Sequence, residues 1–387
     1  MILNFVCYIH MARTLHRAIL NHLNLENMKK LLMTFAVTLL GGLFASHADA
    51  CTGISLTAQD GSQVVARTVE WAATPMQCGY VVAPRGHQHQ SYTPTGENGL
   101  KYSATYGYVG IYTEYEPFVV EGVNESGLSA GLFFFPQYGE YAPYDSTDNA
   151  KTLCDMQFVS WVLSQFSTID EVKSAINDIT LVTLNHKIGS VHWRIAQPDG
   201  RMVVLEVVAG IPHFYENTLG VLTNAPGFPW HMTNLNNYVN LKPGSVSENT
   251  LKPDVTLRPL GHGSGMLGLP GDFTSPSRFV RATFYQTTAP VWPTGFETVV
   301  QAFHILNNFD IPIGSQHAKA DIPKGLPSAT QFTSATDQTA MKFYYRTAWN
   351  SSIRCIDLKA IDFTAVRYQS HPLDKVQEQP VEMVRIC

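Results

Sequence analysis

Apolar and polar residues alternate in short runs along the part of the chain that follows residue 50, and this alternation predicts β-strands. The first run, residues 51–71, reads CTGISLTAQDGSQVVARTVEW. Ile54 and Leu56 alternate with small polar residues, Asp60-Gly61 is typical of a tight turn, and a β-branched run follows the turn. The pattern predicts a hairpin at this point. Further strand-like runs lie at residues 80–83, 104–109, 119–123 and 129–135.

Helical spacing then interrupts the strands. Residues 152–166 place apolar side chains on one helical face, and Ser167-Thr168-Ile169-Asp170-Glu171 resembles a cap that opens a second helix. Strands return at 192–196, 202–208 and 220–223, helical patterns follow at 231–241, 277–287 and 296–307, and the last pattern is a hairpin across Asn350-Ser351. Because no Pro/Ser-rich linker or internal repeat divides this order, we expect one large α+β domain over residues 51–387, with two sheets packed together between helical layers.

The first 50 residues do not fit that domain. Met28-Lys29-Lys30 is a basic start, residues 31–44 are an apolar run, and Ala48-Asp49-Ala50 is a small-residue cleavage site. These are the three parts of a secretory signal peptide, which we place at residues 28–50. Residues 1–27 are then an upstream extension, or translation starts at Met28 rather than Met1. Export through this peptide would place the protein in the periplasm or outside the cell.

Charge and composition exclude several functions. The chain has 387 residues, of which 45% are hydrophobic, and a net charge of −5 at pH 7. No block of Lys and Arg of the kind that follows phosphates is present, which disfavours nucleic-acid binding. After residue 50 no segment is apolar enough to cross a membrane. Neither CxxC nor HExxH occurs, and scattered histidines are more typical of a surface or core than of metal ligands, so we expect no metal site.

Five cysteines follow the predicted cleavage site: Cys51, Cys78, Cys154, Cys355 and Cys387. An exported protein can form disulfides, but an odd number leaves at least one thiol free. A Cys355–Cys387 or a Cys78–Cys154 bridge would be compatible with the sequence, which decides neither.

Cleavage after Ala50 would make Cys51 the first residue of the mature chain. A thiol attacks carbonyls as its thiolate, and an ordinary Cys has a pKa of roughly 8.5, so it needs a base. A free α-amine with a pKa of about 7.7 to 8.0 suits that task, so one residue would supply both nucleophile and base. The alternative is a lipoprotein or binding protein anchored through a lipid on Cys51. Ala48 stands where a lipoprotein signal normally has Leu, yet the junction alone favours neither reading strongly.

The predicted hairpin bears on the neighbours of Cys51. A turn centred on Asp60-Gly61 would place Cys51 opposite Glu70, with Arg67 nearby on the same strand. Residues 67 and 70 differ by an odd number, however, so a regular strand points them to opposite faces unless a bulge intervenes or the strand ends between them. Spacing alone fits equally well a surface pair of Arg67 and Glu70.

Five ordered blocks of the sequence resemble one family. They read CTGISLTAQDGSQVVARTVEW, EGVNESGLSAGLFFFP, LTNAPGFPWHMTNL, GLPGDFTSPSRFVRA and YYRTAWNSSIRCIDL. Together they are similar to the choloylglycine hydrolase and penicillin V acylase family of N-terminal-nucleophile hydrolases, over essentially all of residues 51–387. The resemblance implies a four-layer αββα fold with two stacked, mainly antiparallel sheets, and hydrolysis of a non-peptide C–N amide bond without a cofactor. It also implies a homotetramer.

The resemblance assigns catalytic roles by position. The nucleophile falls on Cys51 and the neighbouring arginine on Arg67. The family's usual Asp is replaced by Glu70, whose longer arm still accepts a hydrogen bond from the α-ammonium. The oxyanion-hole asparagine falls on Asn224, which on composition alone is also a turn residue before a proline, and the second arginine falls on Arg278. The implied reaction is thiolate attack on the amide carbonyl, protonation of the leaving nitrogen by the α-amine, and hydrolysis of the thioester.

The substrate is less well defined by the sequence. Where the family often has Asn or Tyr, this chain has Phe133, Phe134 and Phe135, so the second oxyanion donor must be a main-chain N–H near Phe133 or Phe134. These phenylalanines with Tyr138 suggest an apolar acyl pocket, although the run is on composition alone more typical of core, and we also count Trp71 as a candidate binding residue. The resemblance allows conjugated bile salts, penicillin V and N-acyl homoserine lactones.

A second hydrolase motif is also present. Residues 127–131 match GxSxG, the serine-hydrolase elbow, which requires a strand before the serine and a helix after it. Here an apolar run follows Ser129, so we expect this serine at the start of a strand and give the motif little weight.

Overall fold

The computed structural model describes residues 50–184 and 189–386. The predicted signal peptide up to Asp49, the upstream extension and Cys387 lie outside the described residues.

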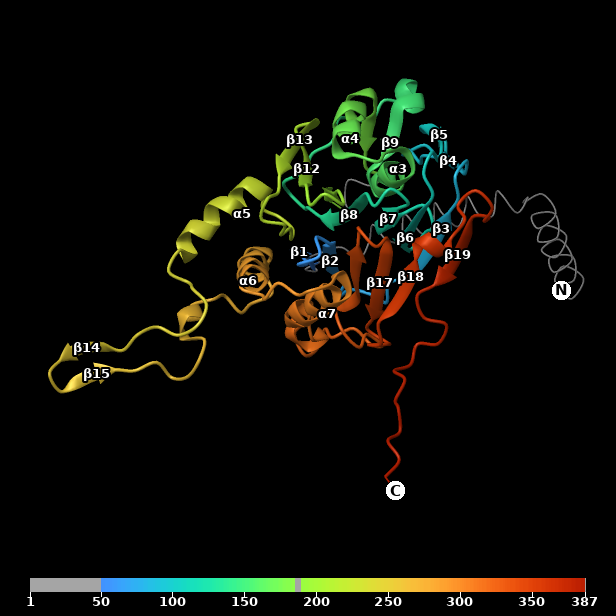
Figure 1. Ribbon diagram of the computed structural model, residues 1–387. Coiled ribbons are helices and arrows are strands. Elements are labelled where there is room, and N and C mark those ends of the chain that lie inside the picture. Colours follow the sequence, from blue (N-terminus) through green and yellow to red (C-terminus); the bar gives the residue numbers. More distant parts are fainter. Residues whose placement is uncertain (1–49, 185–188, 387) are drawn as a thin grey trace, which may run out of the picture. The chain divides into compact units, whose positions relative to one another are not determined.

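The described chain builds two large antiparallel sheets (Figure 1). Sheet A has five strands, in the order β1 (Ala50–Thr57), β2 (Gln63–Glu70), β16 (Thr330–Asp337), β17 (Lys342–Thr347) and β18 (Arg354–Asp357). Sheet B has eight strands, in the order β13 (Ile211–Glu216), β12 (Met202–Val208), β11 (Val191–Ala196), β8 (Ser129–Phe134), β7 (Val119–Asn124), β6 (Tyr108–Thr113), β3 (Cys78–Ala83) and β19 (Gln369–Pro372). Each sheet joins strands from both ends of the domain.

Helices cover the outer face of each sheet, as Figure 1 shows. Helices α6 (Ser275–Thr287) and α7 (Gly295–Leu306) pack on β1, β2 and β16 of sheet A, and α3 (Phe158–Gln165) packs on β7 and β8 of sheet B. Helix α4 (Ile169–Ala175) follows α3 along the chain. The order of layers is therefore helix, sheet, sheet, helix, which confirms the expected α+β fold of four αββα layers. Apolar side chains of the two sheets and of the helices form the core.

The remaining helix and the short strands lie in the connections. They are α5 (Phe228–Asn234), β4 (Gln88–Gln90), β5 (Lys101–Ser103), β9 (Thr152–Cys154), β10 (Thr180–Val182), β14 (Asn249–Lys252) and β15 (Val255–Leu257). No helix within residues 50–184 and 189–386 is both long and apolar enough to cross a membrane.

Several predicted elements are confirmed with changed ends. The helix expected over 152–166 begins only at Phe158, because residues 152–154 pair with β10 as a short parallel strand. The second helix has the expected cap, since the Thr168 side chain and Glu171 bond each other's main chain reciprocally. Ser129 is the first residue of β8, as expected. Residues 220–223 form no strand of a sheet, and only Leu222 bridges to Gly53.

The register of the first hairpin differs by one residue from the prediction. Cys51 lies opposite Val69, and Glu70 lies opposite Ala50. The turn is wider than a two-residue one: the Gly61 N–H donates to the Ala58 carbonyl, and Gly61 has a φ of 87°, the arrangement of a turn closed by a glycine bulge. The extra residue shifts every pair by one position.

Of the two disulfides that the sequence left open, the Cys78–Cys154 bridge is absent. Cys78 and Cys154 are both free thiols, the first partly buried and the second buried. Cys355 is free and exposed, and its proposed partner Cys387 lies outside the described residues.

Candidate active site

Cys51 lies near the beginning of β1, in the interior of the protein. Its side chain is 6% exposed and that of Ala50 is 2% exposed. The main-chain N–H of Cys51 donates a hydrogen bond of 2.9 Å to Oδ1 of Asn224. The nitrogen that cleavage after Ala50 would convert into an α-amine is therefore already placed against a polar side chain that comes from a distant part of the sequence.

Every polar atom of Asn224, in the side chain and the main chain, makes a hydrogen bond. Its Nδ2 donates to the carbonyl of Phe134 at 2.8 Å, and its main-chain N–H donates to the Ser275 hydroxyl at 2.9 Å. Its carbonyl accepts from Nε2 of His231 at 2.9 Å. Residue 224 thus lies where sheet B, the first turn of α6 and helix α5 meet, and its side chain has little freedom to rotate. The peptide bond from Ala225 to Pro226 is cis.

Arg278 connects α6 to the start of β1. Its guanidinium donates to the carbonyl of Cys51, to the Thr52 hydroxyl at 2.9 Å and to Oδ1 of Asn224 at 2.7 Å. Only 2% of the residue is exposed. Because Oδ1 accepts from both Arg278 and the Cys51 N–H, the Asn224 amide must present its NH₂ group in the opposite direction, toward Phe134 and the thiol side of the site.

Arg67 lies on the same face of sheet A as the thiol. The register places it opposite Gly53, two residues after Cys51, and side chains two apart on a strand share a face. Its guanidinium donates to the carbonyls of Leu132 and Val120 and stacks 3.9 Å from the centre of the Phe133 ring. Arg67 thus shares the face of the thiol, and its action on the thiol stays a prediction.

A buried carboxylate balances Arg67. Oε2 of Glu121 lies 3.6 Å from the Arg67 guanidinium, and Oε1 of Glu121 accepts from the guanidinium of Arg194. All three residues are at most 2% exposed. Two arginines and one glutamate therefore share a buried position between the sheets.

Glu70 occupies the other face of β2. No bulge separates Arg67 from Glu70 in the pairing of β1 with β2, so the two side chains point apart and do not form the surface pair that spacing allowed. Among the described residues, neither carboxylate oxygen makes a hydrogen bond of ordinary geometry. Burial raises the pKa of Glu70 to about 7, although the charges of Arg278 and Arg67 and the Thr68 hydroxyl favour the ionised form. The Glu70 carboxylate can therefore bind a cation or accept a hydrogen bond from a donor.

The thiol of Cys51 is not activated by its surroundings alone. Burial raises the pKa of Cys51, and the charges of Arg67 and Arg278 and the main-chain N–H of Phe134 compensate only in part, while Glu70 opposes them. A base must therefore remove the proton before the sulfur can attack.

The aromatic residues divide into two groups. Phe133 and Phe135 are at most 1% exposed, and their rings pack on Arg67 and on the His192 ring respectively, so they belong to the core between the sheets. Phe134 is partly buried, Tyr138 is 49% exposed, and the indole N–H of Trp71 bonds Thr74 at 3.1 Å. The expected acyl pocket cannot use the faces of Phe133 and Phe135, which leaves Phe134, Tyr138 and Trp71 as the aromatic candidates.

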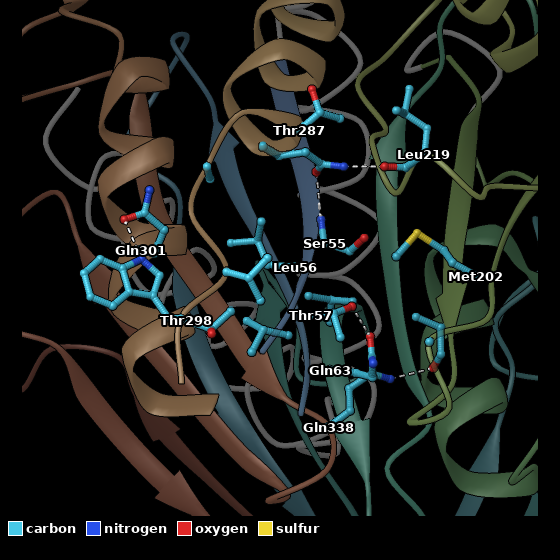
Figure 2. A pocket seen from close by; sticks show the side chains of 18 of the residues that line it. Ser55, Leu56, Thr57, Gln63, Met202, Leu219, Thr287, Thr298, Gln301 and Gln338 are labelled. Carbon is cyan, nitrogen blue, oxygen red and sulfur yellow. Dashed lines mark hydrogen bonds between the residues drawn. The ribbon is translucent and has the colours of Figure 1, made fainter. Parts of the chain in front are cut away.

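A cavity of about 390 Å³ lies at the other end of β1 (Figure 2). Its wall includes Ser55, Leu56 and Thr57 of β1 and Gln286 and Thr287 of α6, and no residue with a charged side chain lines it. Neither Cys51 nor Asn224 contributes to this wall, so the cavity is separate from the site around the thiol.

Sequence reasoning missed the polar residues around Asn224. Ser275 and His231 bond Asn224 itself, whereas His192 bonds the carbonyl of Thr223 and Glu206 bonds the main-chain N–H of Phe228. Scattered histidines are more often core residues than functional ones. Their role depends on contacts between residues that lie far apart in the chain, for which a single sequence contains no periodic signal.

The two stacked sheets, with a buried cysteine near the start of β1, agree with the class of protein that the family comparison shows, a linear amide C–N hydrolase. The chain belongs to the choloylglycine hydrolase family, whose model, described as linear amide C–N hydrolases, matches residues 51–371.

Known relatives support this class. The bile salt hydrolase/transferase of Clostridium perfringens is 33% identical over 315 residues, which is 80% of this chain and 92% of that protein. The penicillin V acylase of Pectobacterium atrosepticum is 23% identical over 325 residues, covering 78% of each chain. A crystal structure of a conjugated bile acid hydrolase variant from Clostridium perfringens covers 87% of this chain and 100% of its own, with a TM-score of 0.75 and 28% identity.

Proposed function

We propose that this protein hydrolyses N-acyl amides with Cys51 as an N-terminal nucleophile. The observation that carries the proposal is the hydrogen bond from the Cys51 nitrogen to Asn224, reinforced by Arg278 on the same oxygen. A nitrogen that is merely part of a strand needs no such arrangement, whereas a catalytic α-amine must be oriented toward its own thiol. Burial of the thiol adds a second reason, because its raised pKa calls for an adjacent base.

The proposed reaction follows from the positions of the groups. The α-amine takes the Cys51 proton, and the sulfur attacks the amide carbon. The Phe134 N–H that faces the thiol and the second N–H of the Asn224 amide stabilise the oxyanion, which is the usual role of such donors. The ammonium then protonates the leaving nitrogen, and water hydrolyses the thioester. Glu70, opposite residue 50 in the register, would accept a hydrogen bond from that ammonium once Ala50 is removed.

Intact mass spectrometry of the exported protein, followed by kinetics, tests the proposal. We expect a mass that begins at an unmodified Cys51, and turnover that disappears in Cys51→Ala. A diacylglyceryl mass on Cys51, with hydrolysis unaffected by its replacement, would instead support the alternative, an anchored lipoprotein or binding protein.

The substrate proposed is an amide that joins an apolar acyl group to a polar amine. The relatives named as bile salt hydrolases favour a conjugated bile salt, the one named as a penicillin V acylase favours penicillin V, and a long-chain N-acyl homoserine lactone has the same amide. Measuring kcat/KM for glycocholate, penicillin V and that lactone side by side decides among them.

Export and activation are proposed to be one event. Ala50 and Cys51 are both buried and Ala50 pairs with Glu70 inside the hairpin, so a peptidase could not reach this bond in the folded chain. Cleavage during export, before folding, avoids that difficulty and places the mature enzyme in the periplasm or medium. A precursor that retains residues 28–50 should be inactive, and an active uncleaved precursor would refute this proposal.

We also propose that the chain self-associates, in keeping with the expected tetramer. The segment between α5 and α6 exposes several large apolar side chains: Val239, Leu251, Val255, Leu257, Leu260 and Leu267. Such a group on one segment is typical of an interface. Sedimentation equilibrium should give a mass several times that of one chain, reduced by Leu260→Asp with Leu267→Asp, and a monomeric mature protein would contradict the proposal.

A further inference from the structure

Two buried residues that the proposed reaction does not use lie directly behind Asn224. His192 on β11 and Glu206 on β12 are 0% and 2% exposed. Nδ1 of His192 lies 3.2 Å from Oε1 of Glu206, and Nε2 of His192 lies 3.1 Å from the carbonyl of Thr223. The ring is fixed from the side by Phe135, whose ring is parallel to it at 4.4 Å.

The hydrogen-bond chemistry leaves little choice of arrangement. A carbonyl can only accept, so Nε2 of His192 carries a proton and donates to Thr223. Oε1 of Glu206 accepts the main-chain N–H of Phe228 at 2.8 Å, and the same oxygen faces Nδ1 of His192. The two outer hydrogen bonds therefore have fixed directions, one to the Thr223 carbonyl and one from the Phe228 N–H.

The hydrogen bonds of His192 to Thr223 and of Glu206 to Phe228 hold the two ends of one short loop. Thr223 directly precedes Asn224, and Phe228 is the first residue of α5, so the pair holds residues 224–227 at both sides. The loop passes close to Glu206 at Gly227, because a Cβ added to this glycine would lie only 3.1 Å from Oε2 of Glu206. The two residues lie on β11 and β12, which are hydrogen-bonded neighbours inside sheet B.

We infer that His192 and Glu206 are positioning residues that hold the Asn224 loop, and with it the Asn224 amide, in the geometry needed for the oxyanion. The inference rests on the proposed role of Asn224. Neither residue touches the reacting atoms; both act through the main chain on either side of Asn224. A displacement of about 1 Å in such a donor can cost roughly 10²-fold in rate, so the pair contributes to turnover without contacting substrate.

The test uses His192→Phe, which keeps the ring stacked on Phe135 but removes both hydrogen bonds, and Glu206→Gln, a change of similar shape. We expect kcat for the best amide substrate to fall by about 10-fold to 10²-fold, with KM changed by less than about threefold. Alkylation of Cys51 by iodoacetamide, followed by peptide mass mapping, should keep its rate within about twofold, because this displacement forms no oxyanion.

A matched control variant and a double-mutant cycle complete the design of the experiment. His213 pairs with Glu206 from β13 but is exposed, so His213→Phe should leave turnover unchanged. Asn224→Ala combined with His192→Phe should lose no more activity than Asn224→Ala alone, because both changes remove the same donor.

Each other outcome counts against a particular claim. If kcat is unchanged in both variants, or if the losses in the cycle add up, the pair does not act through Asn224. If Cys51 alkylation slows as much as turnover, the pair supports the fold generally, and the positioning role is wrong. If Asn224→Ala itself remains fully active, the proposed oxyanion role fails first, independently of His192 and Glu206.

Discussion

The main-chain nitrogen of Cys51 and the side chain of Asn224 are joined by a hydrogen bond of 2.9 Å across 173 positions of sequence. The contact fixes the orientation of the bond that precedes Cys51, and Arg278 holds the accepting oxygen from the other side at 2.7 Å. Because the Asn224 oxygen is occupied in this way, its NH₂ group remains for Phe134 and for a developing oxyanion. In the proposed reaction, this one asparagine would therefore contact both the amine and the carbonyl.

Replacing the nucleophile should abolish hydrolysis. Cys51→Ala removes the group that forms the thioester, so we expect turnover to fall by at least about 10³-fold while the thermal midpoint changes little. The matched control is Cys355→Ala, since Cys355 is a free thiol and the exposed one among the described cysteines, and its loss should leave the steady-state rate unchanged. If Cys51→Ala retained activity, the proposal that Cys51 is the nucleophile would be wrong.

Removing the Asn224 amide should lower kcat more than it raises KM. We expect Asn224→Ala to reduce kcat by about 10²-fold to 10³-fold, the usual cost of one oxyanion donor. Asn237→Ala changes an exposed asparagine close by in sequence and should have no effect. A loss confined to KM would mean that Asn224 binds the substrate rather than its transition state.

Glu70 should make the stability of a chain that retains Ala50 depend on pH. Its pKa is raised from 4.5 to about 7, so the folded state holds this proton more tightly than the unfolded state. The stabilisation that follows is complete below pH 4.5 and is lost as the pH rises through 7, an effect of roughly 3 kcal/mol. Urea unfolding of the wild type and of Glu70→Gln should therefore give free energies of unfolding that differ more as the pH rises, with the variant the more stable of the two. Parallel pH profiles would show that Glu70 has an ordinary pKa.

Glu121 should be essential for stability, because it balances two buried arginines. Glu121→Gln leaves Arg67 and Arg194 together without a counter-charge, and breaking a buried pair in this way typically costs about 3–5 kcal/mol. Glu125→Gln breaks the half-exposed bond to Arg85 and should cost less than about 1 kcal/mol. Denaturant titrations measure both, and equal losses for the two variants would contradict this account of the buried cluster.

The sequence alone determined the class of fold and most of the strands that carry a clear pattern. The stretches 202–208 and 119–123 alternate or run apolar because both faces of sheet B are covered, and such burial is visible in composition. The strand β16, at the centre of sheet A, was missed. It is buried along nearly its whole length, yet it consists mainly of Thr, Ser, Gln, Ala and Asp, so burial left no apolar periodicity. Cys51 could be proposed as the nucleophile because it follows a predicted cleavage site and heads the first of the five blocks that resemble the family.

Only the tertiary structure decided what surrounds Cys51. The glycine bulge at Gly61 moved the hairpin by one residue, and so assigned Arg67 to the face of the thiol and Glu70 to the face of Ala50. The same packing placed Phe133 and Phe135 in the core and brought Asn224, Arg278, His192 and Glu206 to one position from four separate segments. A one-residue shift reverses every side chain of a strand, and contacts across more than a hundred residues have no local pattern. The sequence therefore determines which residue we propose as the nucleophile, and the packing of the two sheets determines which residues surround it.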